Sequence, residues 1–245
     1  LRLARPDAVL DIAPLAELRE YGRANGSLDV GALTTQRTLE RDGSVREACP
    51  LLAQAIPYVG HAAIRNRGTI GGTVAHADPA AEVPVVLAAL GGSVTLRSVA
   101  GKRTLSAAEY FKGFLMTDGR PDELLTTVHF PTTDANVGTA FEEFARRPGD
   151  FALVSVACAV EADDGGAVRS ARVALGGVAG APVVLGGLDQ LAGMQGAQAA
   201  DAAAQIADSA IDPTADVHGS AEYRRHLTRE LVKRAFSRAL QGRRR

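Results

Sequence analysis

The sequence predicts an α+β protein made of two units, and three observations support this. The chain has 245 residues, of which 46% are hydrophobic, so it can bury one large core or two modest ones. A polar stretch, TTDANVG at 132–138, interrupts it near the middle. Beyond that stretch, alternating strand patterns come first and Ala-rich helical patterns follow, which is typical of an α+β module. We therefore expect domains at 1–131 and 138–245.

In the first unit, period-two alternation and short apolar runs predict strands at 8–12, 27–34, 93–98, 101–105 and 122–131. Segment 15–21 fits either a strand or a short helical turn. Helices are expected at 35–42 behind an N-cap Thr35, at 45–59 with breaks at Pro50 and Pro57, at 82–89 as a buried helix, and at 106–114 behind Ser106. The segment between 64 and 81 is expected to be a glycine-rich loop.

In the second unit, segments 140–145, 151–162 and 169–176 predict an antiparallel sheet. Residues 197–209 favour a helix by propensity. A longer helix is expected from Ser220 to about Leu240, with Leu227, Leu231 and Ala235 on one face. The final run Arg243–Arg245 is interpreted as a solvated end.

Composition and motifs exclude several function classes. A net charge of −1 gives no reason to expect nucleic acid or a charged membrane as partner. No apolar run approaches the roughly 20 residues of a membrane span. Cys49 and Cys158 have no neighbours at iron–sulfur or zinc spacing, so we expect reduced thiols in packed cores and a cytoplasmic location. Without GxSxG, HExxH or GxGxxG patterns, we expect no catalytic side chain, no metal ligands and no Rossmann mode.

The most informative stretch is IRNRGTIGGTVAHADPAAEVP at 64–84. Gly71 and Gly72 lack a Cβ, so the backbone here could approach a ligand closely and direct its N–H groups at a phosphate. A Gly-Gly pair after Thr69 is more often an ordinary turn. Asp78 and Glu82 follow within a dozen residues and could hold a sugar, which favours a nucleotide-type cofactor.

This stretch resembles the flavin-binding signature in the medium subunit of molybdenum hydroxylases. The resemblance is strongest to carbon monoxide dehydrogenase medium subunits and weaker to the xanthine dehydrogenase flavin domain, and it extends through nearly the whole chain. It implies a vanillyl-alcohol-oxidase (PCMH-type) FAD-binding domain at 1–131 and a carbon monoxide dehydrogenase flavoprotein C-terminal domain at 138–245.

The resemblance also implies FAD-binding residues. Thr69, Ile70, Gly71 and Gly72 match the second phosphate loop of the family, and Thr73 matches a position that touches the cofactor. Asp78 and Glu82 match positions near the ribityl chain and the adenosine ribose, and Leu125 matches an aliphatic residue that packs against the flavin. Phe151, in RRPGDFA, matches an aromatic residue in front of the flavin ring; core packing is the alternative for this side chain.

One expected motif does not occur in the printed sequence. The family has a first phosphate loop, Ala-Gly-Gly-x-Ser, that should lie just upstream of LRLARP. We therefore expect that this chain lacks the first FAD subdomain and retains little or no FAD.

The function implied by the resemblance is electron transfer. A large subunit with a molybdenum cofactor would oxidise the substrate, a small subunit with two [2Fe-2S] clusters would pass electrons on, and FAD here would receive them. The resemblance implies a dimer of such heterotrimers. Two alternatives remain open: a flavin-free scaffolding subunit of the same complex, and a stand-alone flavin oxidoreductase of the same fold.

Overall fold

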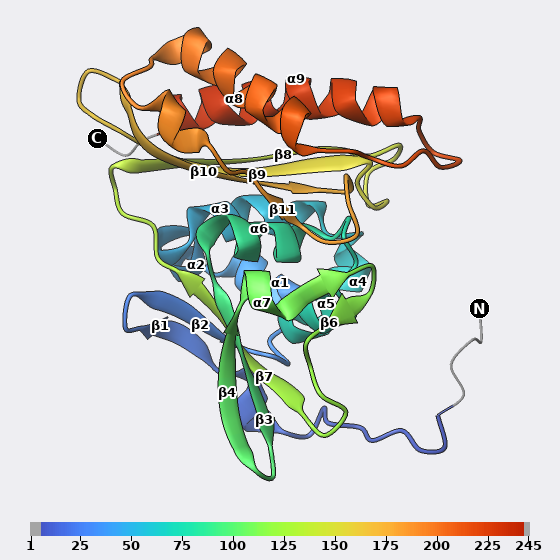
Figure 1. Cartoon of the computed structure of the whole chain (residues 1–245). Coiled ribbons are helices and arrows are strands. Elements are labelled where there is room, and N and C mark those ends of the chain that lie inside the picture. The colour runs from blue at the N-terminus through green and yellow to red at the C-terminus, as the bar shows by residue number, and fades with distance from the viewer. Residues whose placement is uncertain (1–5, 243–245) are drawn as a thin grey trace.

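The chain folds into four layers, two of sheet and two of helix (Figure 1). The computed structural model describes residues 6–242. Helices α8 and α9 cover one face of a four-stranded sheet, and a layer of short helices that includes α3 and α6 lies against its other face. A five-stranded sheet closes the opposite side of that helical layer.

The five-stranded sheet belongs to the first half of the chain and is antiparallel throughout, in the order β1-β2-β7-β3-β4. Its strands are β1 (Tyr21–Ala24), β2 (Ser27–Gly31), β3 (Ser93–Ser98), β4 (Gly101–Ser106) and β7 (Leu124–Pro131). Side chains alternate across it, so Val94 and Leu96 of β3 are buried while Arg97 is exposed.

The helices of the first half of the chain are short and are separated by prolines, glycines and caps. They are η1 (Ala16–Arg19), α1 (Gln36–Arg41), α2 (Gly43–Ala48), α3 (Pro50–Ala55), η2 (Ile56–Tyr58), α4 (Ala62–Arg65), α5 (Ile70–His76), α6 (Glu82–Leu90) and α7 (Ala107–Tyr110). A small hairpin, β5 (Phe111–Gly113) and β6 (Met116–Thr117), follows α7.

The second half of the chain forms an antiparallel sheet in the order β11-β10-β9-β8. The elements are β8 (Val137–Phe144), β9 (Val154–Ala162), β10 (Val168–Gly176), β11 (Val183–Val184), η3 (Leu188–Leu191), α8 (Gly196–Ala210) and α9 (Ala221–Gln241). Buried alanines of α8 and the apolar face of α9 pack on the outer side of this sheet.

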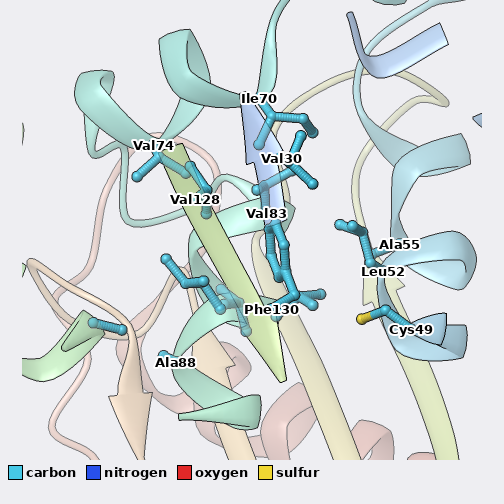
Figure 2. Packing of buried hydrophobic residues seen from close by; sticks show 14 of the residues in the cluster. Val30, Cys49, Leu52, Ala55, Ile70, Val74, Val83, Ala88, Val128 and Phe130 are labelled. Atoms are coloured by element: carbon cyan, nitrogen blue, oxygen red, sulfur yellow. The ribbon is translucent and has the colours of Figure 1, made fainter. Parts of the chain in front are cut away.

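Helix α6 joins the two halves because it is buried on all sides. Val83, Val85 and Val86 are completely inaccessible to solvent, as expected for a helix that is apolar all round. The core beneath α6 includes Val30, Val128 and Phe130 of the five-stranded sheet (Figure 2). The same cluster contains Phe141, Ala157 and Ala174 from the four-stranded sheet, so one core is continuous between the halves.

Most expected elements are confirmed, with the following differences. Residues 8–12 form no strand; they are largely exposed and pair with no other strand. Segment 15–21 divides into η1 and the start of β1, and the helix expected at 106–114 ends at Tyr110, where β5 begins. The segment expected as a glycine loop contains α5, and β8 starts at Val137, inside the predicted 132–138 linker.

The two cysteines are buried as predicted, Cys49 in the core of the first half and Cys158 in that of the second. The run Arg243–Arg245 lies outside the described residues. None of the helices between residues 6 and 242 has the length and apolar character needed to cross a membrane.

Candidate functional site

The glycine stretch forms the first turn of helix α5. Thr69 is the N-cap residue, and its hydroxyl oxygen accepts a hydrogen bond from the Gly72 N–H at 3.0 Å. The helix ends at Ala77, which adopts the left-handed conformation with φ of 53°. Capping and packing therefore form a helix here despite the low helix propensity of two adjacent glycines.

Gly71 is required by packing against Ala32, in the turn that follows strand β2. Its N–H donates to the carbonyl oxygen of Ala32 at 2.9 Å, and a Cβ at position 71 would lie 2.4 Å from the Cβ of Ala32. No other side chain fits at this crossing. Gly71 thus permits a close approach between helix α5 and the turn after β2, both within this chain.

The first-turn N–H groups of α5 are already satisfied inside the chain. Ile70 donates to the Thr34 carbonyl at 3.0 Å, and Thr73 donates to the Thr69 carbonyl at 3.1 Å. Gly71 and Gly72 donate to Ala32 and Thr69, as described above. In this structure these four N–H groups therefore have acceptors within the chain, and their use in binding a phosphate stays a prediction.

A cavity of about 360 Å³ lies beside this turn and is lined from both halves of the chain. The first half contributes residues of α1, of the η2–α4 segment, of α5 and of the start of α6, and the second half contributes the β8–β9 connection. Its lining residues are Gln36, Val59, Gly60, Ile64, Gly68, Thr69, Gly72, Thr73, His76, Ala81, Glu82, Gly149, Asp150 and Phe151.

Gln36 supplies the cavity with an unsatisfied acceptor. The side chain is only 2% exposed, and its Nε2 donates to the Thr73 hydroxyl oxygen at 2.7 Å. Its Oε1 is buried and accepts no hydrogen bond from the described part of the protein. Sequence reasoning missed Gln36, because a glutamine in the first turn of a helix gives no sign that it will be buried.

Glu82 is a second buried acceptor, at the first position of α6. It is 3% exposed, and burial raises the pKa of its carboxyl to about 7, with a further contribution from the negative charge of Asp78. The Arg65 guanidinium opposes this rise but does not bond to Glu82. Arg65 instead pairs with Glu40 at 3.0 Å and donates to the Val59 and Gly60 carbonyls, which fixes one wall of the cavity.

A second carboxyl group with a raised pKa, on Glu143 of β8, lies close enough to Glu82 for the charge of Glu82 to affect it. Burial, and then repulsion from Glu82, raises the pKa of Glu143 to about 8. Its Oε2 is buried without a hydrogen-bond partner in residues 6–242. The two carboxyls come from different halves of the chain, and the sequence gives no sign that they meet.

The structure brings together five of the nine predicted site residues. Thr69, Gly72, Thr73, Glu82 and Phe151 line the 360 Å³ cavity. Ile70 and Gly71 are buried beneath it, and Leu125 is part of the hydrophobic core. Asp78 lines a separate cavity of about 980 Å³, and its carboxylate accepts from the Ala80 N–H at 2.9 Å.

Phe151 belongs to neither hydrophobic core. It is 57% exposed and lies on the β8–β9 connection, where it lines both cavities together with Gly149 and Asp150. Simple core packing, the alternative considered from the sequence, therefore does not describe this side chain.

Comparisons with known proteins match this chain to the same family that the sequence resembles, over nearly its whole length. Residues 1–133 match the family described as "FAD binding domain in molybdopterin dehydrogenase", and residues 139–239 match "CO dehydrogenase flavoprotein C-terminal domain". The chain is 36% identical to the nicotine 6-hydroxylase medium subunit of Paenarthrobacter nicotinovorans, over 96% of this chain and 83% of that one.

Two further relatives carry related names. Identity is 33% to the carbon monoxide dehydrogenase medium chain of Hydrogenophaga pseudoflava, over 98% of this chain and 84% of the relative. The crystal structure of quinoline 2-oxidoreductase from Pseudomonas putida 86 superposes with a TM-score of 0.94 at 35% identity, covering 100% of this chain and 85% of that chain.

The fold and the matched ranges thus define an FAD-binding subunit of an oxidoreductase. The chain belongs to the family of FAD-binding medium subunits of molybdenum hydroxylases, of the carbon monoxide dehydrogenase type.

Proposed function

We propose that this chain holds the sugar and ring portions of FAD in the 360 Å³ cavity and passes electrons from the iron–sulfur clusters of a small subunit to an external acceptor. The observation that carries the proposal is the cavity itself. It joins the glycine turn of α5 to an exposed aromatic residue, Phe151, from the other half of the chain.

The lining fits the sugar and ring portions of such a cofactor. The unsatisfied oxygen of Gln36 and the buried carboxyl of Glu82 are acceptors for ribityl or ribose hydroxyls. The Thr73 hydroxyl accepts from Gln36 and keeps its own hydrogen free to donate. Val59, Ile64 and Phe151 provide apolar surface for a flat ring.

In this role the side chains of the cavity bind and orient the cofactor and shield it from water. None of them acts as an acid or a base. Bound FAD supplies the redox chemistry, since it accepts electrons singly and releases them in pairs. Phe151 covers apolar surface without donating a hydrogen bond, so it can exclude water from a ring face and leave the hydrogen bonding to other groups.

We further propose that the chain works in the cytoplasm, beside a large molybdenum-cofactor subunit and a small subunit with two [2Fe-2S] clusters, as a dimer of heterotrimers. The names "medium subunit" and "medium chain" of its relatives support an assembly of several chains. Light scattering on native material should give a mass several times that of this chain, and a clean monomer would contradict the proposal.

The cavity assignment is tested by flavin titration of matched variants. Thr73→Val removes a hydroxyl from the cavity, and Glu82→Gln replaces one carboxyl oxygen, an acceptor, with an NH2 donor. Each should weaken FAD binding at least tenfold, measured by quenching of FAD fluorescence. Thr104→Val, on β4 of the five-stranded sheet, is the control and should bind as the wild type does. Equal affinity in all variants would contradict this site. A native complex that contains this chain and shows no flavin absorbance would favour the scaffolding alternative. A flavin-loaded active protein purified without partners would favour a stand-alone oxidoreductase.

A further inference from the structure

The 145–153 connection between β8 and β9 separates the two cavities. Gly149, Asp150 and Phe151 line the 360 Å³ cavity on one side and the 980 Å³ cavity on the other. The position of this connection therefore sets the shape of both spaces. Exposed loops of this kind are mobile unless specific contacts hold them.

The tip of the connection rests on His61. Gly149 has a φ of +87°, and a Cβ at this position would lie 2.5 Å from Cε1 of the His61 ring. The glycine therefore lets the backbone lie directly on the imidazole. This contact defines how closely the tip approaches the first half of the chain.

The end of the connection is held from the opposite side by Arg224, in the first turn of α9. Arg224 is 7% exposed, and its Nη1 donates to the carbonyl oxygens of Leu153 at 2.5 Å and of Gly177 at 2.9 Å. Leu153 is two residues from Phe151, and its own N–H donates to the Phe144 carbonyl at 2.8 Å. One buried guanidinium thus fixes the point from which Phe151 projects.

Asp216 orients this arginine. The Nη2 of Arg224 donates to one oxygen of Asp216 at 2.7 Å, and the other oxygen accepts from the N–H groups of His218 and Gly219 at 2.8 and 3.0 Å. The carboxylate is held by two backbone donors, so it can hold the guanidinium in one orientation. Gly177 in turn donates to the Pro79 carbonyl at 2.9 Å, which extends the network to the first half of the chain.

We propose that Arg224, oriented by Asp216, is a positioning residue that holds the Phe151-bearing connection as the partition between the two cavities. Through it, the C-terminal helix α9 controls the geometry of the cavity assigned to FAD. The effect on the FAD cavity rests on the proposed function. The positioning of the connection by Arg224 involves residues of this chain alone.

Hydrogen–deuterium exchange of the full-length chain in its native complex tests the proposal, because peptides covering 145–153 report the connection alone. A hydrogen bond to a charged group is worth about a factor of ten or more in a local opening equilibrium. Arg224→Met should therefore speed exchange in 145–153 at least tenfold, while β9 and α9 exchange as in the wild type. Asp216→Asn and Arg224→Lys should have the same effect to a smaller extent.

Arg225→Met is the matched control. Arg225 is the next residue on α9, but it donates to the Asp208 carbonyl at 2.7 Å and to Asp212 at 3.3 Å, away from the connection. Exchange in 145–153 should not change in this variant. If Arg224→Met does not fold, Asp216→Asn and Arg224→Lys decide the result.

Unchanged exchange of 145–153 in folded Arg224 and Asp216 variants would overturn the inference. The visible circular dichroism of bound flavin is recorded on the same samples. Faster exchange together with an altered flavin signal would support both proposals. Faster exchange with an unchanged flavin signal would support the positioning role of Arg224 and contradict the placement of FAD beside Phe151.

Discussion

At the residue scale, the two adjacent glycines have different roles. Gly71 lies against the Ala32 backbone, whereas a Cβ at Gly72 would meet only the Thr69 hydroxyl, at 2.9 Å. A side chain at 71 must push the helix away from the backbone of Ala32, but at 72 only the Thr69 hydroxyl has to move. Both glycines were expected from the sequence to serve the phosphate, and only Gly72 lines the cavity.

We therefore predict that Gly71→Ala costs on the order of 1–3 kcal/mol of folding free energy by overpacking. Gly72→Ala should change stability by no more than about 1 kcal/mol, because the gain in helix propensity offsets a weakened cap. Urea unfolding of the two variants measures the difference. A Gly71→Ala protein as stable as Gly72→Ala would contradict the packing role.

The buried carboxyls of Glu82 and Glu143 make stability depend on pH. Their pKa values in the folded chain, about 7 and about 8, lie above the ordinary value of 4.5. Between pH 4.5 and 8 the folded state binds more protons than the unfolded state, so stability falls as pH rises through this window.

We predict a loss on the order of a few kcal/mol between pH 5 and pH 8.5, since each unit of pKa shift is worth about 1.4 kcal/mol. Glu82→Gln and Glu143→Gln should each flatten the profile, and the double variant should remove most of it. Urea unfolding at a series of pH values is the measurement. Parallel profiles for the wild type and the double variant would show that this pair is not responsible.

At the element scale, Gln54 of α3 protects the free edge of the four-stranded sheet. Strand β8 is at the end of the sheet order, so its outward N–H and C=O groups have no neighbouring strand. The Gln54 side chain accepts from the Phe141 N–H at 3.1 Å and donates to the Thr139 hydroxyl at 3.1 Å. It thereby joins the two halves of the chain.

We predict that Gln54→Ala lowers the free energy of unfolding by about 1–3 kcal/mol, because it leaves the Phe141 N–H buried without a partner. Gln205→Ala, at an exposed position of α8, should be neutral or slightly stabilising. Chemical denaturation of both variants provides the comparison, and equal stabilities would exclude the role proposed for Gln54.

The secondary-structure elements differ in how well they could be predicted from the sequence. Strands with clear alternation, such as β3 and β7, and helices with caps or long apolar faces, such as α6 and α9, were predicted correctly. Helix α5 was missed because its stability comes from the Thr69 cap and from packing on Ala32, which outweigh two glycines. Gln36 and Glu143 were missed because nothing local marks a polar residue that tertiary packing will bury.

At the scale of the whole molecule, the cavity requires both halves of the chain at once. Gly149, Asp150 and Phe151 close a space whose other walls come from residues 36–82. Helix α6 is buried between the two sheets, so neither half has a complete core without the other. The two matched family ranges, 1–133 and 139–239, therefore describe two sequence units that share one core.

We predict that FAD raises the thermal stability of the chain as one cooperative unit. A ligand that binds only the folded state at 100 times its Kd adds about 2.7 kcal/mol, which raises Tm by roughly 5–10 °C for a chain of this size. Because the cavity and α6 couple the halves, scanning calorimetry should show a single transition that moves upward with FAD. Two transitions, of which FAD moves only one, would mean that the flavin is held by one half alone. In that case the β8–β9 connection would not be a wall of the binding site, and Phe151 would have no contact with the cofactor.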